Sequence, residues 1–402
     1  MASEHTIQPN RLVRKCALLF ALALFGYPII GNAISLLQMD SRLLSVPFRI
    51  IVALFSLWII VTTRRLHVDR VRQAMLLIWC LYSVRLIHDW LLTPLEGADY
   101  ALQFFVATSV LPAIALMKGR AYDQRSFALR GFVVASLGSI ISILALRFGG
   151  GDTQDLTSSS GRLSLTALDP VTLGNLAVSA TLCAMPLWSR CTNVSKIAMA
   201  AVVCGLLLCL LLTGSKGPAL ALLACIGLYA MRRGKMLRFA ILVLPVSLWL
   251  VTSASSPLAE RLAAAGEDES TTDRIVVLTD SIDQIASAPL IGSAFVELNS
   301  GFYPHDVFVE ASMALGVPVG LLFAGLVLFG LVKALKELKG PNYLLPMLYI
   351  QGVLAAAISG SLFGSTLLWV TLAILPMQRK PARNAGRARA GNSAALLPAP
   401  NA

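Results

Sequence analysis

Long apolar runs separated by short polar stretches make up most of the chain. A helix needs roughly 20 predominantly apolar residues to cross a hydrocarbon core about 30 Å thick. Runs of about this length lie near 16–38, 43–61, 73–92, 99–117, 126–146, 171–189, 196–213, 217–231, 237–253, 305–333, 341–360 and 362–376. The pattern predicts an all-α polytopic membrane protein with about 12 transmembrane helices. Because this number is even, we expect both termini on the same side of the membrane.

The composition agrees with the hydropathy pattern. Of the 402 residues, 56% are hydrophobic and 13% are charged, which is about half the charged fraction of a typical soluble protein. Most of the 33 lysines and arginines fall near the termini and in alternate loops, whereas the opposite loops carry most of the acids. The positive-inside rule therefore predicts cytoplasmic termini. The net charge of +12 then reflects topology and contact with membrane lipids, and we expect no nucleic-acid binding.

The chain is expected to divide into membrane and loop segments. Residues 1–15 form a cytoplasmic N-terminus, 16–146 transmembrane helices 1–5, 147–170 an outer loop and 171–253 transmembrane helices 6–9. Residues 254–304 form one large outer loop, 305–376 transmembrane helices 10–12, and 377–402 a disordered cytoplasmic tail. No cleavable signal peptide is expected, because the first apolar run is too long and lacks a small-residue cleavage site.

The large outer loop contains a helical pattern. Ser270 and Asp273 have the spacing of a capping box, and apolar residues then recur at helical spacing over 275–285. Pro289 ends the pattern. We predict a short amphipathic helix that lies on the outer face of the membrane spanned by the chain, with Arg274 in its first turn.

Two arginines lie within predicted spans. Each of them, Arg49 and Arg85, costs roughly 2.5–3.5 kcal/mol on insertion scales, which makes it a functional candidate. Arg85 precedes Asp89 by one helical turn. The alternative is therefore an ion pair that only ties helices together.

The stretch YPHDVFVEASMALGVPVG, residues 303–320, begins a long apolar run with three ionisable groups. Asp306 and Glu310 are one helical turn apart and repel each other, but the positive end of the helix dipole favours both carboxylates. The same dipole disfavours protonation of His305, and a general base needs a neutral imidazole. The alternative is that His305 is only an interfacial anchor. Pro318 is expected to kink the helix.

Four segments, in order, resemble motifs of the bacterial O-antigen ligase and polymerase family of multi-span glycosyltransferases. GRLSLTALDPVTLG carries Arg162 and is similar to the family's Arg-rich outer loop, and LLTGSKGP is similar to its Ser-(Arg/Lys)-Gly turn, with Lys216 in the basic position. TDRIVVLTDSIDQIASAPLIGSAF places Arg274 at the arginine of the large-loop segment. YPHDVFVEASMALGVPVG looks like the Pro-His-Asn-x-x-x-Glu motif and supplies His305 and Glu310.

The resemblance covers roughly residues 160–320 and has two departures. Asp306 stands where the family usually has asparagine, so the local charge differs. Lys216 replaces the more frequent arginine, which keeps the positive charge but loses bidentate phosphate recognition.

The resemblance implies a glycosyltransferase in the bacterial inner membrane whose active site faces the periplasm. Its donor would be a glycan linked to undecaprenyl pyrophosphate, and its acceptor a sugar hydroxyl. The cations expected to bind the pyrophosphate are Arg162, Lys216, Arg274 and Arg147. The residues expected to take part in catalysis are His305, Asp306 and Glu310.

Several alternatives stay open at the level of sequence. An acceptor on lipid A-core would make the chain an O-antigen ligase, and a growing lipid-linked glycan would make it a repeat-unit polymerase. A transporter or flippase of lipid-linked sugars is the candidate from another class. No D-x-D motif is present, and no Cys/His pattern indicates a metal site. We therefore expect transfer without a metal or another cofactor.

Overall fold

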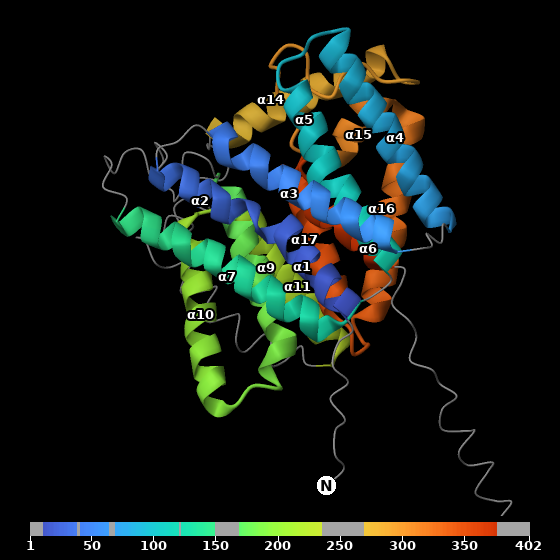
Figure 1. Ribbon diagram of the computed structural model, residues 1–402. Helices are drawn as coiled ribbons and strands as arrows, with labels where there is room; N and C mark the ends of the chain where they lie inside the picture. Colours follow the sequence, from blue (N-terminus) through green and yellow to red (C-terminus); the bar gives the residue numbers. More distant parts are fainter. Residues whose placement is uncertain are drawn as a thin grey trace, which may run out of the picture.

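The computed structural model describes residues 11–37, 41–63, 69–119, 122–148, 169–234 and 269–375, and every regular element in these ranges is a helix (Figure 1). The predicted span at 237–253, most of the loop at 147–170 and the C-terminal tail lie outside the described residues. Six of the described helices are long and apolar enough to cross a membrane. The chain is thus a polytopic helical membrane protein, whereas the number of 12 spans and their topology stay predictions.

The first predicted span is two helices, α1 (Arg11–Phe25) and α2 (Tyr27–Leu37). The break falls at Gly26, where an added β carbon would lie 2.7 Å from Cζ of Phe48 and from the carbonyl oxygen of Leu22. Phe48 belongs to α3 (Ser41–Thr62), which packs against α2. A larger residue at Gly26 would therefore push α3 away from the α1–α2 junction.

The next helices contain one irregular segment. After α4 (Arg70–Leu91), the elements α5 (Ala98–Phe104), η1 (Phe105–Val110) and α6 (Leu111–Gly119) follow one another without a break, and η1 is a π-helical turn. The hydroxyls of Thr108 and Ser109 in this turn lie 3.3 and 3.0 Å from the hydroxyl of Thr366. The π turn therefore faces the α17–α18 connection, where the widened backbone gives two hydroxyls access to one partner.

The second half of the chain is built around α17. Its helices are α7 (Gln124–Phe148), α9 (Pro170–Trp188), α10 (Asn193–Leu212), α11 (Lys216–Arg232), α14 (Glu269–Ser287), α15 (Val307–Leu315), α16 (Val317–Glu337), α17 (Leu344–Ser359) and α18 (Thr366–Ile374). Helix α17 packs against α9, α11, α16 and α18, and lies in the middle of the bundle (Figure 1). Its end at Ser359 is consequently surrounded by other elements.

The prediction of a single helix over 305–333 is wrong. The run is interrupted at Gly316, which has φ of 85° and separates α15 from α16. An added β carbon there would lie 2.2 Å from the carbonyl oxygen of Leu290, so only glycine lets the 289–292 turn cross the break. Pro318 occupies the first turn of α16, where its missing N–H costs nothing, and does not kink a continuous helix.

The predicted amphipathic helix of the large loop is present as α14. Val277, Ser281 and Gln284 on one face are buried, whereas Ile275 and Ile282 on another face are more than half exposed. The face toward the protein thus combines an apolar side chain with two polar ones, while two isoleucines face away from it. This orientation suits a helix that lies on a bilayer surface.

Candidate active site

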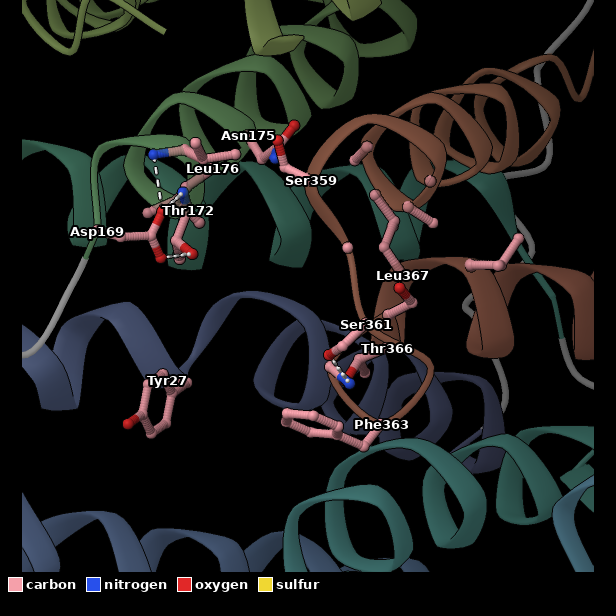
Figure 2. A pocket seen from close by; sticks show the side chains of 18 of the residues that line it. Tyr27, Asp169, Thr172, Asn175, Leu176, Ser359, Ser361, Phe363, Thr366 and Leu367 are labelled. Atoms are coloured by element: carbon pink, nitrogen blue, oxygen red, sulfur yellow. Dashed lines mark hydrogen bonds between the residues drawn. The ribbon is translucent and has the colours of Figure 1, made fainter. Parts of the chain in front are cut away.

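A cavity of about 660 Å³ opens where several segments distant in sequence meet. Its walls come from the α1–α2 junction, the start of α5, the start of α9, Arg274 of α14, the segment before α15 and the α17–α18 connection. Figure 2 shows Asp169, Thr172 and Asn175 on one side, and Tyr27 and Phe363 across the opening. His305 also lines this cavity.

His305 is held in an unusual backbone conformation. Its φ of 59° is the one positive value at a non-glycine residue in the described part of the chain. Such conformations cost roughly 1–3 kcal/mol and gather at functional sites. The imidazole lies 4.5 Å from the Tyr303 ring, centroid to centroid, and hydrogen-bonds the backbone of Ser359. Its Nδ1 has no partner among the described residues, so one ring nitrogen is not engaged by the protein.

The surroundings of His305 favour its neutral form. Burial lowers the pKa of the imidazole below its ordinary 6.5, and the charge of Arg274 lowers it further. The negative charge of Asp169 and the Ser359 hydrogen bond act in the opposite direction without reversing the shift. At neutral pH the ring is therefore available to accept a proton.

Arg274 reaches the same end of the cavity from α14. Its Nη1 donates a hydrogen bond to Oγ of Ser359 at 3.1 Å. Since His305 contacts the backbone of this serine, a single residue at the end of α17 is the common neighbour of both groups. The structure thus brings together two of the sequence-predicted residues, one cation and one potential base.

Asp169 is a cavity residue that the sequence did not single out. It is the N-cap of α9, where Oδ1 accepts the backbone N–H groups of Val171 and Thr172 at 2.8 and 2.9 Å. Its Oδ2 accepts the Thr172 hydroxyl at 2.6 Å. The signal was present in the sequence, because an aspartate directly before proline is typical of a helix start. What the sequence could not show is that this helix start faces His305.

Lys216 begins α11 and is half-buried, but it is not among the described residues that line the cavity. The turn that carries it nevertheless packs near the site. An added β carbon on Gly217 would lie 3.2 Å from Ile358, the residue before Ser359. Lys216 therefore lies at the same end of the bundle as Arg274 and His305.

The other two predicted cations cannot be placed at the cavity. Arg162 lies outside the described residues. Arg147 belongs to the last turn of α7, and its side chain is not described. Their assignment to pyrophosphate binding stays a prediction.

The two carboxylates after His305 are not among the described residues that line the cavity, and their expected part in catalysis stays a prediction. Asp306 caps α15, and its Oδ1 accepts the N–H groups of Phe308 and Val309 at 2.7 and 3.1 Å. Glu310 is fully buried and accepts the hydroxyl of Tyr82 at 2.6 Å and the N–H of Leu362 at 2.7 Å. Both groups thus accept hydrogen bonds from protein donors, which orient their carboxylates within the described structure.

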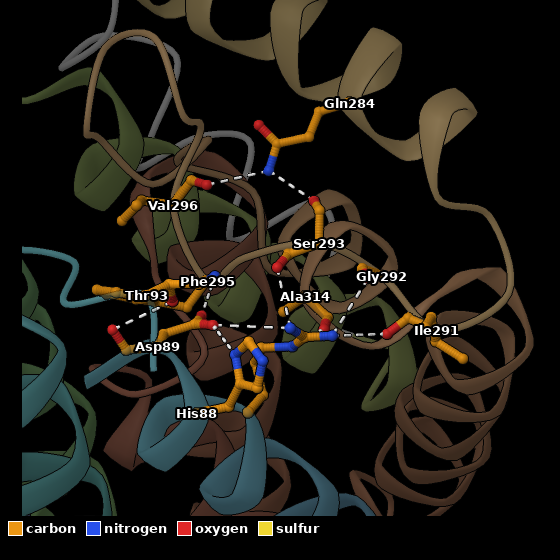
Figure 3. A network of polar contacts seen from close by, with 11 residues as sticks. His88, Asp89, Thr93, Gln284, Ile291, Gly292, Ser293, Phe295, Val296 and Ala314 are labelled. Atoms are coloured by element: carbon orange, nitrogen blue, oxygen red, sulfur yellow. Dashed lines mark hydrogen bonds and ion pairs between the residues drawn. The ribbon is translucent and has the colours of Figure 1, made fainter. Parts of the chain in front are cut away.

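The interpretation of Arg85 as a structural tie agrees with its contacts. Its guanidinium lies 3.6 Å from Asp89 and donates to the carbonyls of Ser293 at 2.9 Å and of Ala314 at 2.8 Å. Asp89 in turn accepts the N–H of Phe295 at 2.9 Å. Figure 3 shows this network between α4 and the turn that crosses the α15–α16 break. A buried pair with this many additional hydrogen bonds stabilises the segment that leads to His305.

Residues 200–324 match the model of a protein family described as O-antigen ligase. The matched range contains Lys216, Arg274, His305 and Glu310, whereas Asp169 and Arg162 precede it. No curated protein sequence matches the chain. The resemblance that the outer motifs indicated is thereby confirmed.

Proposed function

We propose, from the match of residues 200–324 to the O-antigen ligase family, that the chain transfers a glycan from undecaprenyl pyrophosphate to a sugar hydroxyl, at the periplasmic side of the bacterial inner membrane. The acceptor in this proposal is lipid A-core, which makes the chain an O-antigen ligase. The observation that carries the proposal is the shared cavity of His305 and Arg274 within the matched family range. A base and a cation at one cavity are what this transfer needs.

In the proposed reaction, His305 is the general base. The acceptor hydroxyl oxygen attacks the anomeric carbon of the donor sugar while its proton passes to the imidazole. The bond between the anomeric carbon and the pyrophosphate oxygen breaks, and undecaprenyl pyrophosphate leaves with the electron pair. The lowered pKa of His305 keeps the imidazole neutral and ready to take this proton.

Arg274 supports departure of the leaving group. Negative charge develops on the pyrophosphate as the bond breaks, and a fixed guanidinium stabilises that charge with bidentate hydrogen bonds. Lys216, at the same outer end, adds a point charge. We assign Arg162 and Arg147 to the same group on the resemblance of the outer loop, and we propose that the transfer needs no metal.

The acceptor is tested by the glycans of a strain that lacks the gene. An O-antigen ligase leaves polymer on its undecaprenyl carrier and unmodified lipid A-core, and this is the expected result. A repeat-unit polymerase would instead leave lipopolysaccharide capped by a single repeat, which would replace the ligase assignment. Normal lipopolysaccharide in the deletion strain would argue against both.

A further inference from the structure

The side of the cavity opposite α9 is aromatic. Tyr27 and Phe363 each line it and each stand nearly at right angles to Phe104, with interplanar angles of 85° and centroid separations of 5.9 and 6.4 Å. Phe363 also contacts Tyr303 at 6.0 Å, and Tyr303 contacts His305. Aromatic rings therefore continue from the α1–α2 junction to the imidazole. We call Tyr27, Phe104, Phe363 and Tyr303 the aromatic wall.

These rings differ from those of the protein core. Phe104 is half-buried and lines the cavity, whereas its neighbour Phe105 is fully buried and packs on Tyr82 and Trp369. Tyr27, Tyr303 and Phe363 are also half-buried. Rings that serve only packing are normally covered by other side chains, but the aromatic wall borders open space.

Tyr100 contacts the aromatic wall, and Arg49 contacts Tyr100. Tyr100 stacks on Phe104 with ring centroids 5.9 Å apart and hydrogen-bonds Tyr27. The guanidinium carbon of Arg49 lies 4.7 Å from the Tyr100 ring centroid, and its other contacts are to Ser45 of its own helix. This arginine is 5% exposed, and its cost in the membrane is offset in part by the cation–π contact. Arg49 and Tyr100 therefore fix the rings in place.

The opposite side of the cavity is polar. Asp169 and Thr172 face the opening from the first turn of α9 (Figure 2). Oδ1 of Asn175, one turn further on, is buried and has no hydrogen-bond partner among the described residues. A buried amide oxygen without a partner indicates a donor that the protein itself does not supply.

A polar side facing an aromatic side matches the chemistry of a sugar. A pyranose ring presents C–H groups, which carry partial positive charge, on one face, and these are attracted to the negative faces of aromatic rings. Its hydroxyls point outward and donate to amide and carboxylate oxygens. A polyprenyl chain would leave Asn175 unpaired, because it has no hydroxyl groups.

We propose that the aromatic wall and Asn175 form the binding site for the acceptor sugar, with Tyr27 and Phe363 stacking on the ring and Asn175 accepting a hydroxyl. Phe363 contacts Tyr303, and Tyr303 contacts His305. In this proposal, a hydroxyl of the sugar stacked on Phe363 is the one that gives its proton to His305. Arg274 lines the same cavity and, in this proposal, binds the pyrophosphate of the donor. This assignment rests on the proposed glycan transfer and separates the acceptor site from the donor site.

The experiment measures acceptor and donor separately. Purified protein carrying Tyr27→Leu, Phe363→Leu or Asn175→Ala is titrated with lipid A-core lacking O-antigen, first without donor to measure binding. Transfer kinetics with an undecaprenyl-pyrophosphate-linked glycan follow. We expect a roughly 3- to 10-fold weaker affinity and higher acceptor KM for each variant, with the donor KM unchanged. Phe363→Tyr keeps the ring and should lose much less affinity than Phe363→Leu.

Phe329→Leu is the matched control, because Phe329 is a half-exposed ring on α16 that does not line the cavity. Equal acceptor affinity in the wild type and the three cavity variants would overturn the proposal, as would a rise in donor KM instead. So would failure of the wild type to bind lipid A-core. If the wild type binds lipid A-core but transfers nothing, the glycosyltransferase assignment fails. The acceptor affinities of the three cavity variants then still test whether the aromatic wall binds the sugar.

Discussion

Arg274 donates a hydrogen bond to the hydroxyl of Ser359 at 3.1 Å, and thereby joins the amphipathic helix α14 to the C-terminal end of the central helix α17. The two residues are 85 positions apart in sequence. The contact places a guanidinium beside the imidazole of His305, which bonds the backbone of the same serine. A surface helix therefore supplies the charge on which the proposed chemistry depends.

His305→Ala should lower turnover about 10²–10⁴-fold, the usual contribution of a general base, while donor binding is retained. Arg274→Ala should lower turnover and also weaken donor binding, because the pyrophosphate is charged in both the ground and the transition state. The measurement is single-turnover transfer beside a donor titration for each variant. His88→Ala is the control, since His88 is part-exposed and does not line the cavity. Near-normal turnover in His305→Ala would make this residue an anchor.

The pH profile should report the environment of His305. Activity is expected to rise as the imidazole loses its proton, with the acidic limb of kcat/KM below the ordinary pKa of about 6.5. Removing the positive charge in Arg274→Gln favours imidazolium, so the limb should move to higher pH. Removing the negative charge in Asp169→Asn should move the limb to lower pH. Shifts in the reverse directions would show that another group titrates.

Transfer by the purified protein should persist in EDTA. The chain has no D-x-D motif, and cations at the outer end of the bundle can neutralise the pyrophosphate in place of a metal. The assay compares initial rates with and without chelator after extensive dialysis. Loss of activity that is restored by a divalent ion would show that the carboxylates of the outer loops hold a metal.

Glu310→Leu should destabilise the protein more than it changes the chemistry. The substitution leaves the Leu362 N–H and the Tyr82 hydroxyl buried without an acceptor, at a cost of roughly 1–3 kcal/mol for each group. Glu310→Gln keeps one acceptor and should lose less. Thermal unfolding in detergent and the pH profile are measured together, and the acidic limb should stay in place. A large fall in turnover with unchanged stability would instead return Glu310 to the catalytic group.

Sequence alone determined the class of protein and the local start of each functional segment. Hydropathy predicts helices in a membrane because a bilayer leaves the backbone few other ways to pair its polar groups. The helical pattern of α14 and the cap at Asp306 are local, since a turn of helix joins residues three or four apart. The motifs that resemble the O-antigen ligase family also lie in short stretches, which is why Arg274 and His305 could be named without a structure.

Tertiary structure decided which of these residues meet. Glu310 was expected to be catalytic from the motif that it shares with His305, yet its carboxylate is buried and accepts a hydrogen bond from Tyr82, which is 228 positions away. The break at Gly316 depends on a backbone oxygen of Leu290, and the aromatic wall joins Tyr27 to Phe363. The periodic pattern of residues within one helix cannot predict such contacts, because they form only when whole helices pack together. The sequence therefore identified the chemical groups, whereas the packing of the helices determined which of them line the cavity.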